Sequence, residues 1–384
     1  MSKISILTKK LFILTLFSTC FFSNFSCGKA NSQTSAATIA DSLNENASDA
    51  AAPAKTVLDT LTFSFVGDVM PGTTFPESPK GAYLPANGGK NLFDDARQYL
   101  QRADLAFGNL EGSMTEGGTP GKKCSNPNTC YIFRIPTSMA QVLADEGFDL
   151  MNMANNHSHD FGVNGINSSL KALDEVGIKA AGIKDVMPTA IVEKDGVKIG
   201  LIGFSTSGKG IPATQYEAAK ELIKNLSKQV DITVVSLHAG AEGLQYDRVP
   251  RKEEFFLGEN RGDVYKFAHN AIDAGADIVW GHGPHVPRGM ELYKDKLIMY
   301  SLGNFCTPYR MNLKSDTGLA PLVEVKVDSK GNFIDGNIHS FRQQTGVGPR
   351  NDSSNEAARK IMNLSTKDFP ESSLKISADG KMSK

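Results

Sequence analysis

Neither sign of charge dominates this chain. Its 384 residues include 41 lysines and arginines against 42 aspartates and glutamates, so the formal net charge is −1. This balance does not indicate a protein that binds nucleic acid through bulk positive charge, and we expect no nucleic-acid partner. The chain also lacks an internal repeat or a shift in composition that would mark a second domain. Its length is sufficient for one large globular domain with a real core.

The N-terminus has no apolar stretch long enough for a mature transmembrane helix. Residues 11–17 are apolar, but such a run is too short to span a bilayer, and three lysines precede it within the first ten residues. This pattern is typical of a secretory signal peptide, here residues 1–27. Ser26-Cys27-Gly28 resembles the lipobox of bacterial lipoproteins, which predicts a lipid anchor on Cys27 and attachment to the membrane of the cell envelope. Ordinary cleavage, which would give a secreted protein, is the alternative.

Residues 28–58 contain few large apolar side chains and are rich in alanine, serine, asparagine and aspartate. Such a segment cannot bury enough apolar surface to order itself, so we expect a flexible tether. After a lipidated cysteine, it would hold the following domain away from the membrane surface.

Cysteine is scarce, with five residues in the chain, two of them in the signal region. Cys124 and Cys130 flank a turn-rich segment, and in an exported protein this spacing suits a local disulfide. A metal site at this pair is the weaker alternative, because the pair lies in none of the polar clusters described below. Cys306 is expected to be a buried thiol and not a nucleophile.

Strand-like and helix-like segments alternate between residues 62 and 303, which predicts an α/β fold with a mostly parallel sheet and helices on its faces. Helical spacing occurs at residues 91–102, 138–146, 164–176, 215–228 and 263–274. Gly147, Gly177 and Gly275 follow three of these helices as C-terminal stops. Four strands after residue 288 are joined by short turns and are expected to close a second sheet. We place the domain at residues 59–345 and a polar C-terminal tail at residues 346–384.

Five polar clusters each directly follow a strand-like apolar run. They are Gly67-Asp68, Asn109-Leu110-Glu111, Asn155-Asn156-His157, His238 and His282-Gly283-Pro284-His285. In open α/β sheets, ligands bind beyond the carboxyl ends of the strands. Carboxylate, amide and imidazole groups suit divalent cations such as Mn, Fe and Zn without any thiolate. The sequence therefore predicts a metal site.

The cluster around His157 is the densest of the five. A histidine that stays off the metal can act as a general acid near neutral pH, and His157 is placed for this role. We expect His159 and Asp160 to pair with each other in its support. Charge recognition of a substrate would come from Arg134, Arg288, Lys122 or Lys123, although each is more often an ordinary surface cation.

Five motifs together resemble one protein family. They are FVGDVM at residues 65–70, GNLE at 108–111, ANNHS at 154–158, GHGPHV at 281–286 and YSLGNF at 300–305. They are similar to the motifs of the CapA family of capsule or poly-γ-glutamate biosynthesis proteins, a branch of the calcineurin-like metallophosphoesterases. The resemblance covers about residues 63–305.

The resemblance implies a four-layer αββα sandwich with a site for two divalent metal ions. Its implied ligands are Asp68, Glu111, Asn156, His238, His282 and His285. His157 would be the proton donor, and the supporting residues would be Asn109, Asn155, His159 and Asp160. The chain departs from the wider superfamily at three points: no histidine lies two residues after Asp68, Glu111 stands where an aspartate is usual, and His282 and His285 are three residues apart.

Two functions follow from the resemblance. One is a metal-dependent hydrolase that acts at the cell surface on a phosphoester or on an amide bond of an anionic polymer such as polyglutamate. The other is a non-catalytic, membrane-anchored component of a polymer synthesis and export complex. The sequence alone leaves both open.

Overall fold

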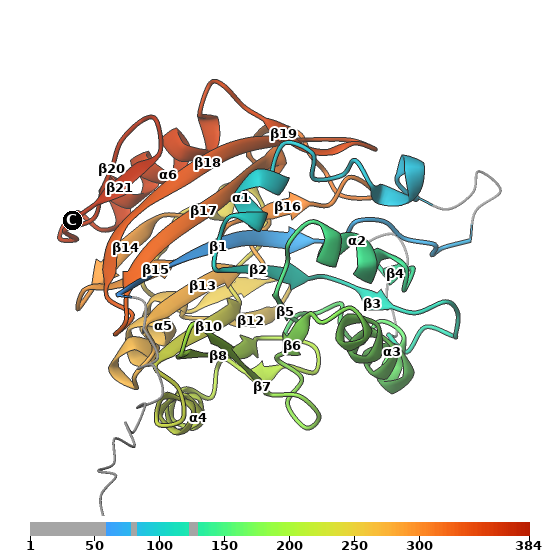
Figure 1. Ribbon diagram of the computed structural model, residues 1–384, viewed down its shortest axis with the longest axis horizontal. Coiled ribbons are helices and arrows are strands. Elements are labelled where there is room, and N and C mark those ends of the chain that lie inside the picture. Colours follow the sequence, from blue (N-terminus) through green and yellow to red (C-terminus); the bar gives the residue numbers. More distant parts are fainter. Residues whose placement is uncertain (1–58, 78–82, 123–129) are drawn as a thin grey trace, which may run out of the picture. The chain divides into compact units, whose positions relative to one another are not determined.

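Two β-sheets form the framework of the protein (Figure 1). The computed structural model describes residues 59–77, 83–122 and 130–384, so the predicted signal peptide, the tether, Cys27 and Cys124 lie outside the described residues. The first sheet has the strand order β20-β21-β18-β17-β1-β2-β5-β6, with β16 beside β1 and β19 beside β18. The second has the order β14-β15-β13-β10-β8-β7, with β9 beside β8.

The first sheet consists of β1 (Thr60–Val69), β2 (Leu105–Leu110), β5 (Leu150–Asn152), β6 (Lys179–Ala181), β16 (Asn304–Cys306), β17 (Leu319–Asp328), β18 (Phe333–Gln344), β19 (Gly348–Asn351), β20 (Lys375–Ile376) and β21 (Lys381–Ser383). The second consists of β7 (Thr189–Lys194), β8 (Val197–Ser205), β9 (Ile211–Pro212), β10 (Ile232–His238), β13 (Ile278–His282), β14 (Met290–Tyr293) and β15 (Lys296–Met299). Two short pairs stand apart: β3 (Ser113–Met114) with β4 (Arg134–Ile135), and β11 (Glu254–Phe256) with β12 (Glu259–Gly262).

The two sheets pack face to face through an apolar core. Phe65 of β1 stacks on Phe107 of β2 with ring centroids 4.7 Å apart, and the Phe65 ring lies 5.8 Å from that of Trp280 on β13. All three side chains are fully buried. The Trp280 indole N–H donates to the carbonyl of Val66 at 2.9 Å, so the one polar atom of this ring is satisfied across the two sheets.

Helices cover the outer faces of both sheets. The helices are α1 (Arg97–Gln101), α2 (Met139–Asp145), α3 (Gly162–Glu175), α4 (Tyr216–Ser227), α5 (Val264–Asp273) and α6 (Glu356–Asp368). The apolar sides of α1, α2 and α3 pack on the first sheet, and those of α4 and α5 pack on the second. The layer order is therefore α/β/β/α, and the predicted four-layer sandwich is confirmed. None of the helices in the described part of the chain is long and apolar enough to cross a bilayer.

The predicted helices agree with the structure except at residues 91–102, where only the second half is an α-helix. The three glycines expected as stops have positive φ angles of 100°, 85° and 107°. The expectation for the late strands needs a correction, because they divide between the sheets. The β14–β15 pair extends the second sheet, whereas the β17–β18 pair joins β1 in the first.

Residues 346–384 form β19, α6, β20 and β21 and are not a simple polar tail. The reason is an apolar stripe on α6 that the polar composition conceals: Ala357, Ile361 and Leu364 lie on one face and are buried. This face packs against β17, β18 and β14 at the side of the sandwich.

The carboxyl ends of the parallel strands carry the polar clusters. Asp68 of β1 is in register with Asn109 of β2, and His238 of β10 is in register with His282 of β13. Gly67 is required where β1 approaches the chain before β16, because a Cβ at residue 67 would lie 1.9 Å from the carbonyl oxygen of Gly303. This close approach sets Asp68 beside Asn304.

Candidate metal centre

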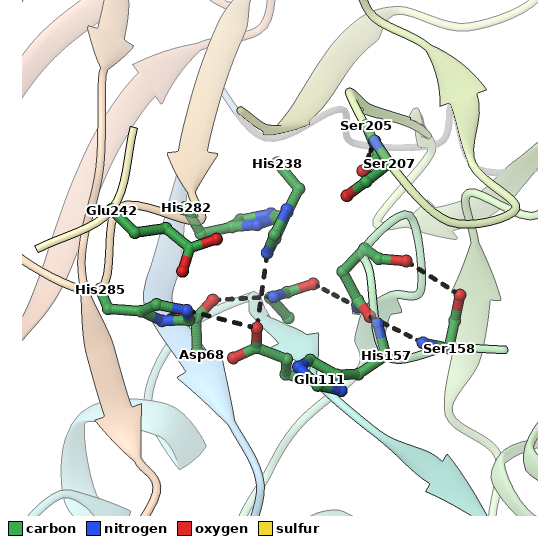
Figure 2. A network of polar contacts seen from close by, with 12 residues as sticks. Asp68, Glu111, His157, Ser158, Ser205, Ser207, His238, Glu242, His282 and His285 are labelled. Carbon is green, nitrogen blue, oxygen red and sulfur yellow. Dashed lines mark hydrogen bonds and ion pairs between the residues drawn. The ribbon is translucent and has the colours of Figure 1, made fainter. Parts of the chain in front are cut away.

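Carboxylates and imidazoles from both sheets converge at one point (Figure 2). Asp68, His238 and His282 form one group, and Asp68, Glu111 and His285 form another, with ligand atoms in each group within 4.8 Å of one another. Asp68 is common to both groups and lies between them. Five of the six ligands implied by the resemblance therefore meet in space, although they come from widely separated parts of the chain.

Several donor atoms of this cluster are buried without hydrogen-bond partners. This is true of both carboxylate oxygens of Glu111, both ring nitrogens of His238, Nδ1 of His282 and Oδ1 of Asn156, the sixth implied ligand. Burying polar atoms without partners is costly, and native proteins rarely do it without a ligand or ion. Nitrogen and oxygen donors in this mixture suit divalent cations, so the residues present fit the implied metal ions.

Glu111 lies between two imidazoles. Its Oε1 is 3.5 Å from Nε2 of His238 and 3.8 Å from Nε2 of His285. The other nitrogen of His285, Nδ1, contacts Oδ2 of Asp68 at 2.9 Å. Both carboxylates are completely buried, so their charge requires compensation, which the neighbouring imidazoles supply and a bound cation would increase.

The metal-free cluster shifts the acidity of its members strongly. Burial lowers the pKa of His285, but the charges of Glu111 and Asp68 outweigh this effect and raise it to about 10. Burial and the charge of Glu111 raise the pKa of Asp68. Burial and the neighbouring His238 hold the pKa of His282 well below its ordinary value, which keeps this imidazole neutral. A neutral imidazole is the form that binds metal.

A chain of amides orients Asp68. The amide of Asn109 donates to Oδ1 of Asp68 at 2.8 Å, and Asn152 and Asn155 both donate to Oδ1 of Asn109, at 2.8 and 3.0 Å. Asn109 and Asn155 thus lie where a supporting role requires them. Asn152 was missed at the sequence level because it lies within β5 and not after it, although it points to the same edge of the sheet.

Two further residues contact the histidines from outside the cluster. Ser236 Oγ lies 2.6 Å from Nε2 of His282, and Asn304 Oδ1 lies 3.0 Å from Nδ1 of His285. Asn304 belongs to the YSLGNF motif at residues 300–305, but the motif alone does not indicate this contact. Ser236 faces His282 because neighbouring parallel strands β10 and β13 keep register, a relationship that the sequence does not reveal.

His157 forms its contact with Asp160, at 2.8 Å between Nδ1 and Oδ2. The expected His159–Asp160 pair is therefore wrong: residues 157 and 160 are three apart in a tight turn, which brings them to the same side. The same Asp160 oxygen accepts a hydrogen bond from the backbone N–H of Phe133 at 2.7 Å, which fixes the carboxylate. His159 is half-buried at the pocket wall, and burial together with Lys209 lowers its pKa.

A pocket of about 540 Å³ opens over the centre. Its lining includes Asn156, His157 and His285 from the candidate site, together with Glu242, which the sequence did not single out. Figure 2 shows Glu242 directed toward the same space as His282 and His285. The volume is typical of a site for a small molecule or a short polymer segment.

Of the cationic side chains suggested for substrate recognition, one lines the pocket and two are paired with carboxylates. Lys122 lines the pocket. Arg288 is fully buried and forms two hydrogen bonds with Glu254, at 2.8 and 2.7 Å, so it is structural. Arg134 pairs with Glu77 at 3.1 Å. Lys123 lies outside the described residues.

The two cysteines in the described part of the chain differ in their bonding. Cys130 is disulfide-bonded, but its predicted partner Cys124 lies outside the described residues, so the pairing stays a prediction. Cys306 is a free, fully buried thiol, and burial raises its pKa, which makes it a poor nucleophile.

Comparison with known proteins adds sequence relatives. Residues 62–309 match the family model described as "Bacterial capsule synthesis protein PGA_cap". "Capsule biosynthesis protein CapA" of Bacillus anthracis is 29% identical over 263 residues, which cover 64% of this chain and 59% of that protein. "PGA biosynthesis protein CapA" of Bacillus subtilis is 30% identical over 290 residues, which cover 72% of this chain and 70% of that protein. The match thus spans less than two thirds of the first relative.

Among solved structures, this chain is similar to the calcineurin-like phosphoesterase YfkN from Bacillus subtilis. The similar region covers 81% of this chain and 98% of that chain, with 13% identity and a TM-score of 0.43.

Proposed function

Because the chain belongs to the family of bacterial capsule synthesis proteins, we propose that it takes part in making an anionic surface polymer, as a metal-dependent hydrolase. The observation that carries this proposal is the set of buried donor atoms without hydrogen-bond partners on Glu111, His238 and His282. The substrate we propose is a phosphoester or an amide bond of the polymer itself. The sequence relatives support the polymer, since their names refer to capsule and PGA biosynthesis.

The centre would be held by Asp68, Glu111, Asn156, His238, His282 and His285. The chemistry that divalent cations supply in such a centre is stabilisation of charge on a phosphoryl or carbonyl oxygen and activation of water. The protein itself fixes the ligands: the Asn109 amide orients Asp68, and the hydroxyl of Ser236 occupies Nε2 of His282. Pre-set ligands of this kind bind cations with less reorganisation.

His157 is proposed as the proton donor to the leaving group. Its Nδ1 is held by Asp160 at 2.8 Å, so the imidazole is fixed in one orientation with Nε2 left for proton exchange. The side chain lines the pocket beside the metal ligands, where the leaving atom of a bound substrate would lie. This arrangement suits a general acid better than a further ligand.

We also propose that the protein is exported and attached to the cell envelope through lipid on Cys27. This location would place the hydrolase beside the surface polymer. It rests on the Ser26-Cys27-Gly28 junction and the polar segment after it.

The test uses the purified full chain, incubated with Mn²⁺, Fe²⁺ or Zn²⁺ and then freed of unbound ion. Metal content is measured by mass spectrometry, and turnover is measured with bis(p-nitrophenyl) phosphate and with poly-γ-glutamate. We expect bound metal and metal-dependent turnover of one of these substrates. His238→Ala should lose both, whereas His339→Ala, which removes a histidine of β18 outside the site, should lose neither. A wild-type chain that binds no metal and turns over neither substrate would overturn the hydrolase and favour the non-catalytic component.

A further inference from the structure

One wall of the pocket holds an arginine between two tyrosines. The guanidinium carbon of Arg310 lies 5.7 Å from the ring centroid of Tyr83 and 5.7 Å from that of Tyr131. Both distances are within the range of cation–π attraction. Arg310 and Tyr131 both line the pocket that opens over the metal centre. The two rings restrict the guanidinium, and no acceptor among the described residues takes a hydrogen bond from it, so its N–H groups can meet a ligand.

Arg310 differs from the other arginines near the pocket because no carboxylate of the described residues neutralises it. Arg261, which also lines the pocket, pairs with Glu242 at 2.8 Å and with Glu259 at 3.3 Å. Within the described residues, the charge of Arg310 is therefore unpaired, whereas that of Arg261 is balanced by two carboxylates.

Lys122 adds a second cation to the same wall. Its ammonium group donates to the backbone carbonyl of Tyr131 at 3.2 Å and lies 3.7 Å from Oδ1 of Asp160. Asp160 is already engaged with His157, so its carboxylate only partly offsets the charge of Lys122.

We propose that Arg310 binds an anionic group of the substrate that is separate from the group reacting at the metal centre. The planar guanidinium can form two parallel hydrogen bonds with a carboxylate or a phosphate, and the tyrosines hold it ready to do so. The pocket would thus select a polymer that carries a negative charge on successive units. This inference rests on the proposed function for the position of the reacting bond.

The experiment compares Arg310→Gln with Arg359→Gln in the full chain loaded with metal. Arg359 is an exposed arginine of α6 outside the pocket and serves as the matched control. The probes are penta-γ-glutamate, a pentamer of glycerol phosphate, and penta-γ-glutamate with its α-carboxylates converted to amides. Dissociation constants are measured by calorimetry, and melting temperatures confirm that each variant is folded. Arg310→Lys keeps the charge without the planar fork and supplies a second variant.

We expect Arg310→Gln to weaken binding of at least one charged pentamer by about 10-fold or more, the effect of losing a hydrogen bond to a charged group. The pentamer that loses affinity identifies the anion as carboxylate or phosphate. Arg310→Lys should weaken it less, and Arg359→Gln should not change it. The amidated pentamer should bind no differently to Arg310→Gln and to the wild type. Equal affinity of the wild type and Arg310→Gln for both charged pentamers, or no binding of either to the wild type, would overturn the proposal.

Metal content and turnover of bis(p-nitrophenyl) phosphate, which carries no second anion, are measured on the same samples. If Arg310→Gln loses binding of a charged pentamer but keeps its metal and its turnover of bis(p-nitrophenyl) phosphate, the result supports both the role of Arg310 and the proposed hydrolase. Absence of metal and turnover in the wild type would count against the proposed function alone, because the binding comparison still decides whether Arg310 holds the anion.

Discussion

Ser236 Oγ lies 2.6 Å from Nε2 of His282, and both side chains are completely buried. The remaining nitrogen of His282, Nδ1, has no hydrogen-bond partner. The serine therefore decides which nitrogen is available to a metal ion, because an imidazole whose Nε2 is engaged presents only Nδ1 to a cation.

Replacing Ser236 with alanine should weaken metal binding by about 10- to 100-fold, the usual effect of removing a partner that orients a metal-ligating histidine. Competition with a chelator of known affinity measures the change. Ser64→Ala is the matched control, since Ser64 is an equally buried serine whose hydroxyl donates to the carbonyl of Tyr99 at 2.8 Å, away from the site. Equal metal affinity of the two variants would show that Ser236 does not position His282.

His157→Gln should keep its metal and lose turnover. A glutamine retains the size of the side chain but cannot transfer a proton, and general acid catalysis is typically worth about 10²–10⁴-fold in rate. Asp160→Asn should lose part of the same rate, because the carboxylate that holds Nδ1 of His157 becomes neutral. Metal content and turnover are measured on the same samples, with His238→Ala as the variant expected to lose metal.

The result for metal content separates the roles within the site. If His157→Gln loses as much metal as His238→Ala, then His157 is a ligand and not the donor. If His157→Gln only lowers the melting temperature and keeps full activity per folded molecule, the histidine merely supports its turn.

Metal binding should release protons in the neutral range. In the metal-free protein, the pKa of His285 is raised from its ordinary value of 6.5 to about 10, so this imidazole is protonated at pH 8 and must give up a proton to become a ligand. Metal affinity should therefore rise about tenfold per pH unit between pH 7 and pH 9, as one released proton requires. Calorimetry in buffers with different ionisation enthalpies counts the protons. His285→Gln should remove this contribution, and a wild-type affinity that does not change with pH would contradict the assignment.

The same raised pKa determines how the metal-free protein responds to pH. A histidine with a higher pKa in the folded state stabilises the fold below its unfolded pKa, and this contribution is lost as pH rises through the folded value. For His285, the loss should extend from about pH 6.5 to about pH 10. Bound metal should suppress it, because the ligated imidazole carries no proton on the coordinating nitrogen.

The strand-end clusters could be predicted because a run of apolar residues followed by a polar turn is a local pattern in the sequence. Asp68, His238 and His282 each follow such a run, and the structure brings them together. The contacts of Ser236 and Arg310 could not be predicted in this way. Ser236 faces its histidine through the register of two strands that are 40 residues apart in the chain, and Arg310 lies in a loop whose sequence has no periodicity.

The strand pairing at the C-terminus shows the same limit at the level of the fold. Short turns correctly indicated the two hairpins β14–β15 and β17–β18. Which sheet each hairpin joins depends on the edge left free by the earlier strands, and this is a property of the assembled fold. The buried stripe of α6 was hidden for a related reason: Ala357, Ile361 and Leu364 are spaced through an otherwise polar segment and share a face only once the helix has formed.

Arg288 should be essential for stability. It forms two hydrogen bonds with Glu254 of β11 in a fully buried setting, and its guanidinium also donates to the carbonyl of Ala241 at 3.2 Å. Arg288→Met leaves the Glu254 charge buried and unpaired, which should lower the free energy of unfolding by about 3–5 kcal/mol. Lys171→Met, which breaks the exposed pair with Glu175, should change it by about 0.5 kcal/mol or less. Urea titrations of both variants compare these values, and a similar small effect for both would show that the buried pair is not a stabilising contact.

The lipid anchor is tested by Cys27→Ala expressed in a bacterium that processes lipoproteins. An alanine cannot carry the thioether-linked lipid, so the variant should leave the membrane fraction and be recovered as soluble exported protein. Cys306→Ala is the control, because this buried thiol has no part in attachment and its variant should remain with the membrane. A single acyl chain holds a protein only marginally at a membrane, whereas several chains on one residue hold it firmly, so a true lipoprotein should resist washing with salt. Cys27→Ala that stays in the membrane fraction would exclude this cysteine as the anchor, and a wild-type chain found only in the medium would establish the secreted form.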